Sequence, residues 1–174
     1  MSLRETSPGV FYSDSATVSV CDHDLAFLLQ EARKNDKHRA RICVHPDVSD
    51  AVHEMVICLL DKCYIRPHMH RKAESLHLIE GRCDLVLLAP DGQIMRVVTL
   101  GSRSKETRFI RLAPQVFHTL VIRSEYMMFH ETTRGPFQRE DTVFADWAPA
   151  EGEEQAREYV TRLDQSISDR GKSS

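Results

Sequence analysis

Short apolar runs separated by turn-forming residues fill the chain from residue 52 to residue 133, and this pattern constrains the fold most. The runs cover residues 52–60, 63–70, 74–80, 83–89, 94–100, 107–112, 117–122 and 126–133. About eight short strands at this spacing are typical of an antiparallel β-sandwich or β-barrel. Residues 90–93, PDGQ, predict a hairpin turn, because proline fixes φ and glycine accepts a positive φ.

A helix is predicted on each side of this β region. Apolar residues recur at helical spacing from Leu25 to Ala32, after Asp22, which can cap the helix. A second, amphipathic helix is predicted around residues 156–163. The predicted organisation is a lead-in segment over 1–21, a single domain over 22–164 and a flexible tail over 165–174.

The composition is that of one folded, soluble domain: 174 residues, of which 41% are hydrophobic and 28% are charged. A formal net charge of -3 gives no general attraction to nucleic acid or to acidic membranes, so we expect neither partner. No apolar run is long enough to cross a membrane, and the first residues lack a secretion signal, which favours the cytoplasm. One basic cluster is interpreted as a solvated face: Arg33, Lys34, Lys37, Arg39 and Arg41.

The five cysteines are odd in number and form no CxxC pair. Each lies in or beside an apolar, strand-like stretch, so we interpret them as small buried side chains in a reducing compartment. The alternative is that Cys58 and Cys63 form a disulfide or redox pair.

A candidate metal site lies in the segment from residue 64 to residue 81. Alternate side chains of a strand share a face, so His68 and His70 point into one cavity. The following turn returns Glu74 beside them, and His118 begins a later strand. Three imidazoles and a carboxylate suit one divalent cation such as Zn, Fe, Mn, Ni or Co. Protonated histidines or a water cluster would be the other ways to balance the charge of Glu74.

These residues have the spacing of a known motif. His68, His70, Glu74 and Gly81 stand at the positions of the first cupin motif, HxH-x3-E-x6-G. His118 and the proline before it resemble the second cupin motif, although the usual glycine of that motif is absent. The resemblance implies that all four candidate ligands belong to one cupin-type site.

The wider chain resembles the WbuC family of cupin-fold metalloproteins. The similar segments cover residues 39–46, 65–75, 114–121, 131–137 and 144–151. The resemblance implies a mainly β cupin jelly roll, one bound metal with four protein ligands, and a place near bacterial cell-surface polysaccharide (O-antigen) genes. It implies a site but no particular reaction.

Five further residues are candidates for the pocket around the metal. Arg66 shares the face of the strand histidines and can hold a substrate carboxylate or phosphate, or pair with a carboxylate at the rim. Glu131 and Arg134 can act as general acid or base or as a substrate clamp, or be surface charges. Tyr64 and His45 are substrate-binding candidates; the alternatives are a lid of the core and a loop histidine bonded to backbone. Arg66 and Glu131 are the catalytic candidates.

Two other side chains are interpreted as structural. His77 is out of phase with Glu74, so it should face away from the cavity and lie in the core or at an interface. Trp147 should anchor the irregular segment after the last strand, with a stacking platform for a sugar or base as the alternative.

Three functions remain open at this point. The first is an enzyme acting on a small polar metabolite such as a sugar or sugar nucleotide, by isomerisation or epimerisation or, with Fe(II), as a dioxygenase. The second is a non-catalytic, metal-dependent module that binds a carbohydrate-like ligand, and the third is a purely structural metal. The expected partners are a small-molecule ligand and, by analogy with the cupin fold, a second copy of the chain.

Overall fold

The computed structural model of the chain describes residues 2–171. In chain order its elements are β1 (Leu3–Ser7), β2 (Val10–Ser13), α1 (Asp22–Lys34), β3 (Arg39–Cys43), β4 (Val52–Leu60), β5 (His68–His70), β6 (Glu74–Leu88), β7 (Ile94–Leu100), β8 (Phe109–Leu112), β9 (Phe117–Arg134), the 3-10 helix η1 (Arg139–Asp141), β10 (Thr142–Phe144) and α2 (Gln155–Gly171). No helix in the described part of the chain is both long and apolar enough to span a membrane.

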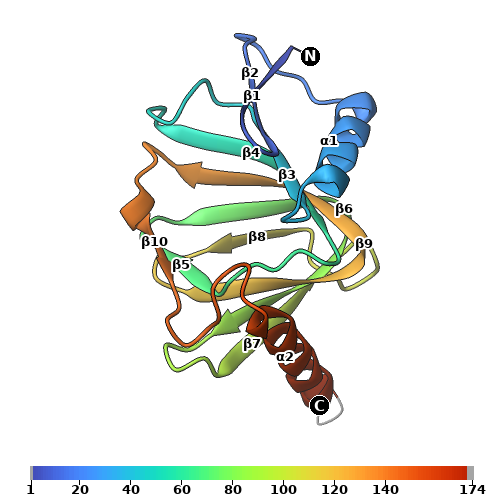
Figure 1. The fold of residues 1–174 in the computed structure, drawn as a ribbon, viewed down its shortest axis with the longest axis vertical. Coiled ribbons are helices and arrows are strands. Elements are labelled where there is room, and N and C mark those ends of the chain that lie inside the picture. The colour runs from blue at the N-terminus through green and yellow to red at the C-terminus, as the bar shows by residue number, and fades with distance from the viewer. Residues whose placement is uncertain (1, 172–174) are drawn as a thin grey trace.

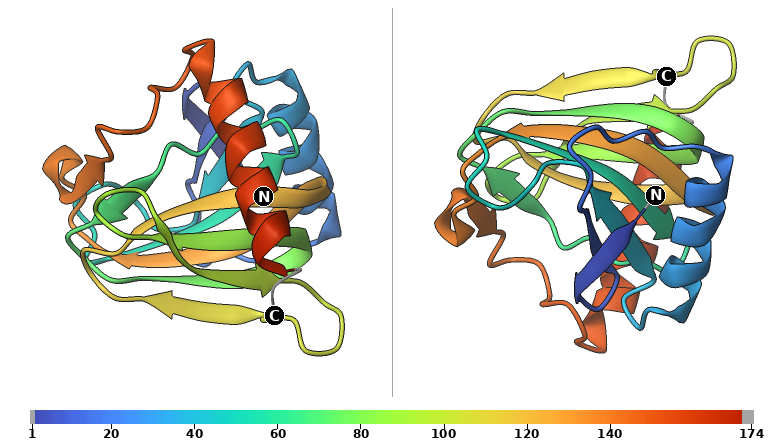
Figure 2. Two further views of the ribbon diagram at one scale, coloured as in Figure 1. Left: turned by 90° about the horizontal axis from the view of Figure 1, so that it is seen from below. Right: turned by 90° about the horizontal axis from the view of Figure 1, so that it is seen from above.

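The strands belong to one curled sheet (Figure 1). Hydrogen bonds join them in the order β1-β2-β3-β4-β9-β5-β10, and β6 pairs with β9, β7 and β8. Seen along its long axis, the molecule shows strands that curve instead of lying flat (Figure 2). The predicted fold class is confirmed in that the chain is mainly β, with an N-terminal and a C-terminal helix. The pairings among the described strands form no ring, so the predicted barrel is an open one.

Two pairs of predicted strands are single long strands in the structure. The runs 74–80 and 83–89 form β6, and the runs 117–122 and 126–133 form β9. These two strands pair along most of their length, with breaks in register on both sides of Gly81. Gly81 has a φ of 86°, and a β-carbon there would collide with the backbone carbonyl of Tyr126. The interruption is therefore a bulge within a strand, not a turn between two strands.

Gly81→Ala is expected to lower the free energy of unfolding by more than about 2 kcal/mol, since it combines a left-handed backbone with a backbone collision. Gly152→Ala is the matched control, because Gly152 has a φ of 90° but no atom within 4 Å of its added β-carbon. That change should cost only the backbone strain, about 1 to 2 kcal/mol. Urea unfolding measures both, and equal losses would contradict the bulge argument.

The predicted lead-in and tail both contribute regular structure. Residues 1–21 contain β1 and β2, and β2 pairs in parallel with β3. Phe11 of β2 is buried and meets Phe27 of α1 edge-to-face, with ring centres 5.1 Å apart. At the other end, α2 continues past residue 164 because Ile167 packs against the same apolar cluster as Leu163. Residues 172–174 of the predicted tail lie outside the described residues.

Helix α1 covers one face of β3 and β4 and fixes the direction of their side chains. Leu28 and Ala32 of α1 belong to the same buried cluster as Ala40 and Ile42 of β3. Because side chains alternate along a strand, the residues at 39 and 41 face the opposite way, toward the interior of the curled sheet. This alternation brings charged side chains to the site described below.

All five cysteines are free, and four of them are buried as predicted, whereas Cys21 is exposed. Burial raises the pKa of Cys58 to about 12 and that of Cys63 to about 11. Both therefore stay protonated thiols at neutral pH, and the alternative of a disulfide or redox pair is wrong.

Candidate metal centre

Three histidines converge inside the curled sheet. His68 and His70 lie two residues apart on β5, so their side chains share a face. His118 lies directly opposite His68 on the neighbouring strand β9. One ring nitrogen from each histidine lies within 4.8 Å of the others. The arrangement matches the imidazole sets that hold Zn and other divalent transition metals in proteins.

The outer ring nitrogens of two histidines are bonded to backbone carbonyls. Nδ1 of His68 lies 2.8 Å from the carbonyl oxygen of Arg66, and Nδ1 of His118 lies 3.0 Å from that of Val116. A carbonyl oxygen only accepts, so each Nδ1 carries the proton and donates it. Both Nε2 atoms of the neutral rings therefore present a lone pair to the centre, the state that a metal ligand needs.

Glu74, at the start of β6, lies beside the imidazoles and is only 5% exposed. Its carboxylate oxygens are 3.0 Å from Nε2 of His118 and 3.5 Å from Nε2 of His70. Since the Nδ1 proton of His118 already goes to a carbonyl, a neutral His118 would turn its lone pair toward an ionised carboxylate. A second proton on His118, or a cation between the two groups, must remove this repulsion.

The electrostatics of the four side chains suit a cation. Burial, with the neighbouring His118 and His70 adding to it, lowers the pKa of His68 to about 3, so the His68 ring is neutral. Burial also lowers the pKa of His70, against the opposing effect of Glu74. Burial opposes charge on His118 and Glu74 too, but their hydrogen bond outweighs it: the pKa of His118 is raised and that of Glu74 is lowered. The three histidines therefore form a possible metal site, with the Glu74 carboxylate beside them.

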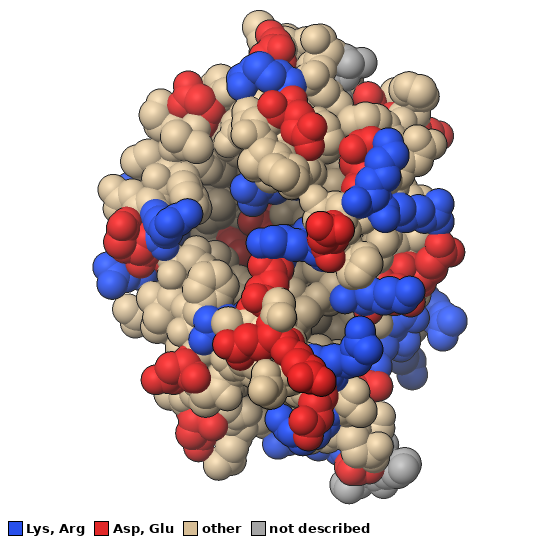
Figure 3. Space-filling view, in the orientation of Figure 1, with Lys and Arg blue, Asp and Glu red and all other residues tan. Residues whose placement is uncertain are grey.

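The candidate metal centre lies in the wall of a cavity of about 890 Å³. Figure 3 shows a hollow in this face of the molecule, with acidic and basic side chains around it. The interior wall is apolar and includes Ile57, Leu59, Leu76, Leu120 and Phe129. This volume lies in the range of about 300 to 1,000 Å³ that is usual for small-molecule sites.

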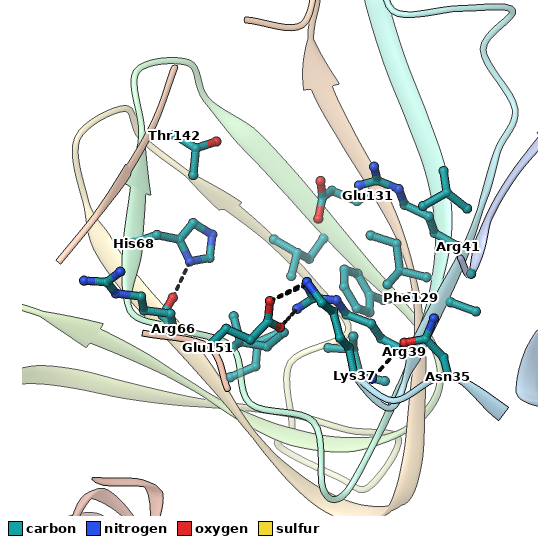
Figure 4. A pocket seen from close by; sticks show the side chains of 18 of the residues that line it. Asn35, Lys37, Arg39, Arg41, Arg66, His68, Phe129, Glu131, Thr142 and Glu151 are labelled. Atoms are coloured by element: carbon teal, nitrogen blue, oxygen red, sulfur yellow. Dashed lines mark hydrogen bonds and ion pairs between the residues drawn. The ribbon is translucent and has the colours of Figure 1, made fainter. Parts of the chain in front are cut away.

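Glu131, predicted as a catalytic candidate, lines the same cavity (Figure 4). It lies on β9 opposite Leu76 of β6 and Met55 of β4. Burial, with the negative charge of Glu74 adding to it, raises the pKa of Glu131 to about 7. A carboxyl group that titrates near neutrality has the property of a general acid or base.

Arg66 lines the cavity, but its guanidinium has protein partners. Nη2 and Nε donate to the carbonyl of Ala145 at 2.6 and 3.2 Å, and the group lies 5.5 Å from the ring centre of Phe144. Arg66 therefore holds the segment after β10 against the site. Tyr64 is not among the lining residues; its hydroxyl donates to the carbonyl of Pro149 at 2.9 Å.

Two other predicted pocket residues lie away from the cavity. His45 is buried and stacks on His53 with ring centres 4.1 Å apart, and its Nδ1 lies 3.0 Å from the carbonyl oxygen of Glu54. Arg134 ends β9 as an exposed side chain and does not line the cavity. His45 thus has the surroundings of a histidine bonded to backbone, and Arg134 has those of a surface charge. These are the alternatives given for the two residues above.

His77 faces away from the cavity as expected but does not lie in the core, and Trp147 anchors the irregular segment as expected. His77 is exposed and meets Phe109 edge-to-face at 6.2 Å. The indole of Trp147 donates to the carbonyl of Pro90 at 2.8 Å and packs near Tyr159, which fixes the irregular segment on the predicted hairpin turn.

Sequence reasoning missed the charged side of the cavity. Lys37, Arg39 and Arg41 line it, together with Glu151 from the segment before α2. The first three were interpreted as part of a solvated face. The available signal was the alternation of basic and apolar residues at 39–42, which is typical of a strand with one charged face.

One protein family and several solved structures are similar to part of this chain. The model of a family described as a domain of unknown function (DUF6016) matches residues 20–100, which is less than half of the chain. A comparison with proteins of curated function found no match.

Solved structures share part of the architecture at low sequence identity. Protein SO0799 from Shewanella oneidensis is 10% identical with a TM-score of 0.49, over 58% of this chain and 66% of that protein. Oxalate decarboxylase from Bacillus subtilis is 16% identical with a TM-score of 0.46, over 61% of this chain and 27% of the enzyme. The oxalate decarboxylase formate complex from Lactobacillus farciminis is 17% identical with a TM-score of 0.44, over 56% of this chain and 28% of that enzyme. The chain thus spans less than two thirds of each of these proteins.

Proposed function

We propose that this chain is a metal-dependent enzyme that acts on a small polar metabolite. One divalent cation (Zn, Fe, Mn, Ni or Co) is held by His68, His70, Glu74 and His118. The observation that carries the proposal is the meeting of three imidazoles within 4.8 Å in the wall of an open cavity that Glu131 also lines. A purely structural cation is normally enclosed by its four ligands, and it needs neither a cavity nor an acid or base.

The proposed reaction class is isomerisation or epimerisation of a sugar or sugar nucleotide, and the sequence resemblance suggests a role in O-antigen biosynthesis. A bound cation would supply Lewis acidity to a carbonyl or enediolate oxygen. Glu131 would move a proton to or from the metabolite, and the apolar wall around Phe129 would keep bulk water from the reacting atoms. A cytoplasmic location and a homodimer belong to the proposal as well, and light scattering of purified protein tests the homodimer.

Two alternatives use the same donor set. Fe(II) bound by three histidines and one glutamate would suit a dioxygenase, and a cavity without turnover would suit a carbohydrate-binding module. Metal analysis of purified protein, followed by turnover screening with sugar nucleotides under air and under argon, separates the three. Oxygen-independent conversion supports the isomerase or epimerase, oxygen consumption supports the dioxygenase, and binding without conversion supports the module.

Glu131→Gln is expected to lower kcat by about 100-fold or more, because the amide cannot exchange a proton in the reaction. The metal content should stay unchanged, since Glu131 is not among the proposed ligands. Glu54→Gln is the matched control: Glu54 lies on β4 outside the cavity lining and should leave kcat unaltered. An unchanged kcat in Glu131→Gln would remove the proton-transfer role.

A further inference from the structure

A basic wall, defined as Lys37, Arg39 and Arg41, forms one side of the cavity. Arg39 and Arg41 alternate along β3, on the face opposite the residues that pack under α1. Their cross-strand partners on β4 are Leu59 and Ile57, which also line the cavity. The register of two strands therefore directs two guanidinium groups into the space that the candidate metal centre faces.

A carboxylate of the protein itself binds to this wall. Glu151 accepts from Nζ of Lys37 at 2.8 Å and takes two bonds from Arg39, at 2.8 Å from Nη1 to Oε1 and 3.2 Å from Nη2 to Oε2 (Figure 4). The two-bond geometry on Arg39 is the one by which arginine binds carboxylates and phosphates. All three side chains are partly exposed, so a ligand that enters the cavity from solvent can compete with Glu151.

Arg41 lies farther along the wall and beside Glu131 (Figure 4). Within residues 2–171 its guanidinium takes part in no recorded hydrogen bond or ion pair. The wall thus holds three cations beside two carboxylates, Glu151 at Lys37 and Arg39 and Glu131 at Arg41. A group with more than one negative charge and several acceptor oxygens satisfies this arrangement better than one carboxylate does.

We propose that the basic wall binds the phosphoryl group of the metabolite, and that Glu151 takes the place of that group when the cavity is free. The inference rests on the proposed function in so far as the cavity is the metabolite site. Lys37 and Arg39 exchange the Glu151 carboxylate for phosphate oxygens, and Arg41 supplies the third cation. The metabolite is then a phosphorylated compound. Its phosphoryl group lies on the basic wall, and its opposite end reaches the histidines across the cavity.

Calorimetric titration of inorganic phosphate into the full-length protein, purified with its metal, tests this assignment. Lys37→Gln/Arg39→Gln and the single variant Arg41→Gln should each weaken phosphate binding by about ten-fold or more, since each removes charged donors. Glu151→Gln should strengthen it several-fold by removing the competing carboxylate, and this gain should vanish in the Lys37→Gln/Arg39→Gln background. Arg33→Gln is the control, because Arg33 pairs with exposed Glu125 away from the cavity and should not alter binding.

Phosphate affinity that does not change in the basic-wall variants would overturn the inference, because phosphate would then be bound elsewhere or by the metal alone. Acetate bound as tightly as phosphate would overturn the phosphoryl assignment. Metal analysis of the same samples separates this result from a failure of the proposed function. Stoichiometric metal with unresponsive phosphate binding defeats only the basic wall, whereas absent metal defeats the metal centre.

Discussion

His118→Ala is expected to lower the metal affinity of the protein by at least about 100-fold, so that the purified variant loses its stoichiometric metal on dialysis. The change removes one of three converging imidazoles and takes away the nitrogen that lies 3.0 Å from the Glu74 carboxylate. It leaves Glu74 buried with His70 as its remaining histidine partner. Mass spectrometry of the metal content per chain measures the loss.

His77→Ala is the matched control for this experiment. It removes the same type of side chain from an exposed position on β6, near Glu74 in sequence but facing away from the cavity. Its metal content should equal that of the unmodified protein. If His118→Ala keeps one metal per chain, His118 is not a ligand and the proposed set of four is wrong.

Asp84→Ala is expected to lower the free energy of unfolding by about 3 kcal/mol, the largest loss we expect from a side chain remote from the cavity. The nearly buried Asp84 carboxylate accepts from Nε of Arg123 at 2.6 Å and from the Thr99 hydroxyl at 2.7 Å. Removing it leaves the largely buried guanidinium of Arg123 without its partner on the sheet.

Asp164→Ala is the control, since Asp164 on α2 pairs with the same Arg123 but is about half exposed. Water replaces an exposed partner, so this change should cost less than about 1 kcal/mol. Thermal and urea unfolding measure both variants. Equal losses would show that Arg123 stabilises the docking of α2 rather than the sheet.

Most of the fold can be predicted from local patterns. The first and last residues of β4 and β7 agree with those of the apolar runs 52–60 and 94–100, because a turn follows each of these strands in sequence. The continuity of β6 through Gly81 cannot be predicted in this way, because a glycine at a bulge and a glycine at a turn give the same local sequence pattern. Strands β1 and β2 are also missed, because much of their surface is polar and β2 is ordered by its pairing with β3.

The candidate site divides in the same way into local and non-local parts. The alternation of His68 and His70 and the return of Glu74 follow from strand geometry within a few residues. The sequence around β3 does not determine whether its charged face meets solvent or a cavity, because that depends on the distant segment that carries Glu151. Likewise, only the fold reveals that His45 stacks on His53 instead of reaching the cavity mouth.

Anomalous diffraction from crystals of the metal-loaded protein, recorded at the absorption edge of the metal, tests the central claim most directly. We predict one anomalous peak per chain, at about 2.0 to 2.3 Å from the inward nitrogens of His68, His70 and His118 and from a carboxylate oxygen of Glu74. A peak bound elsewhere on the chain, or stoichiometric metal with no peak among these four side chains, would contradict the account.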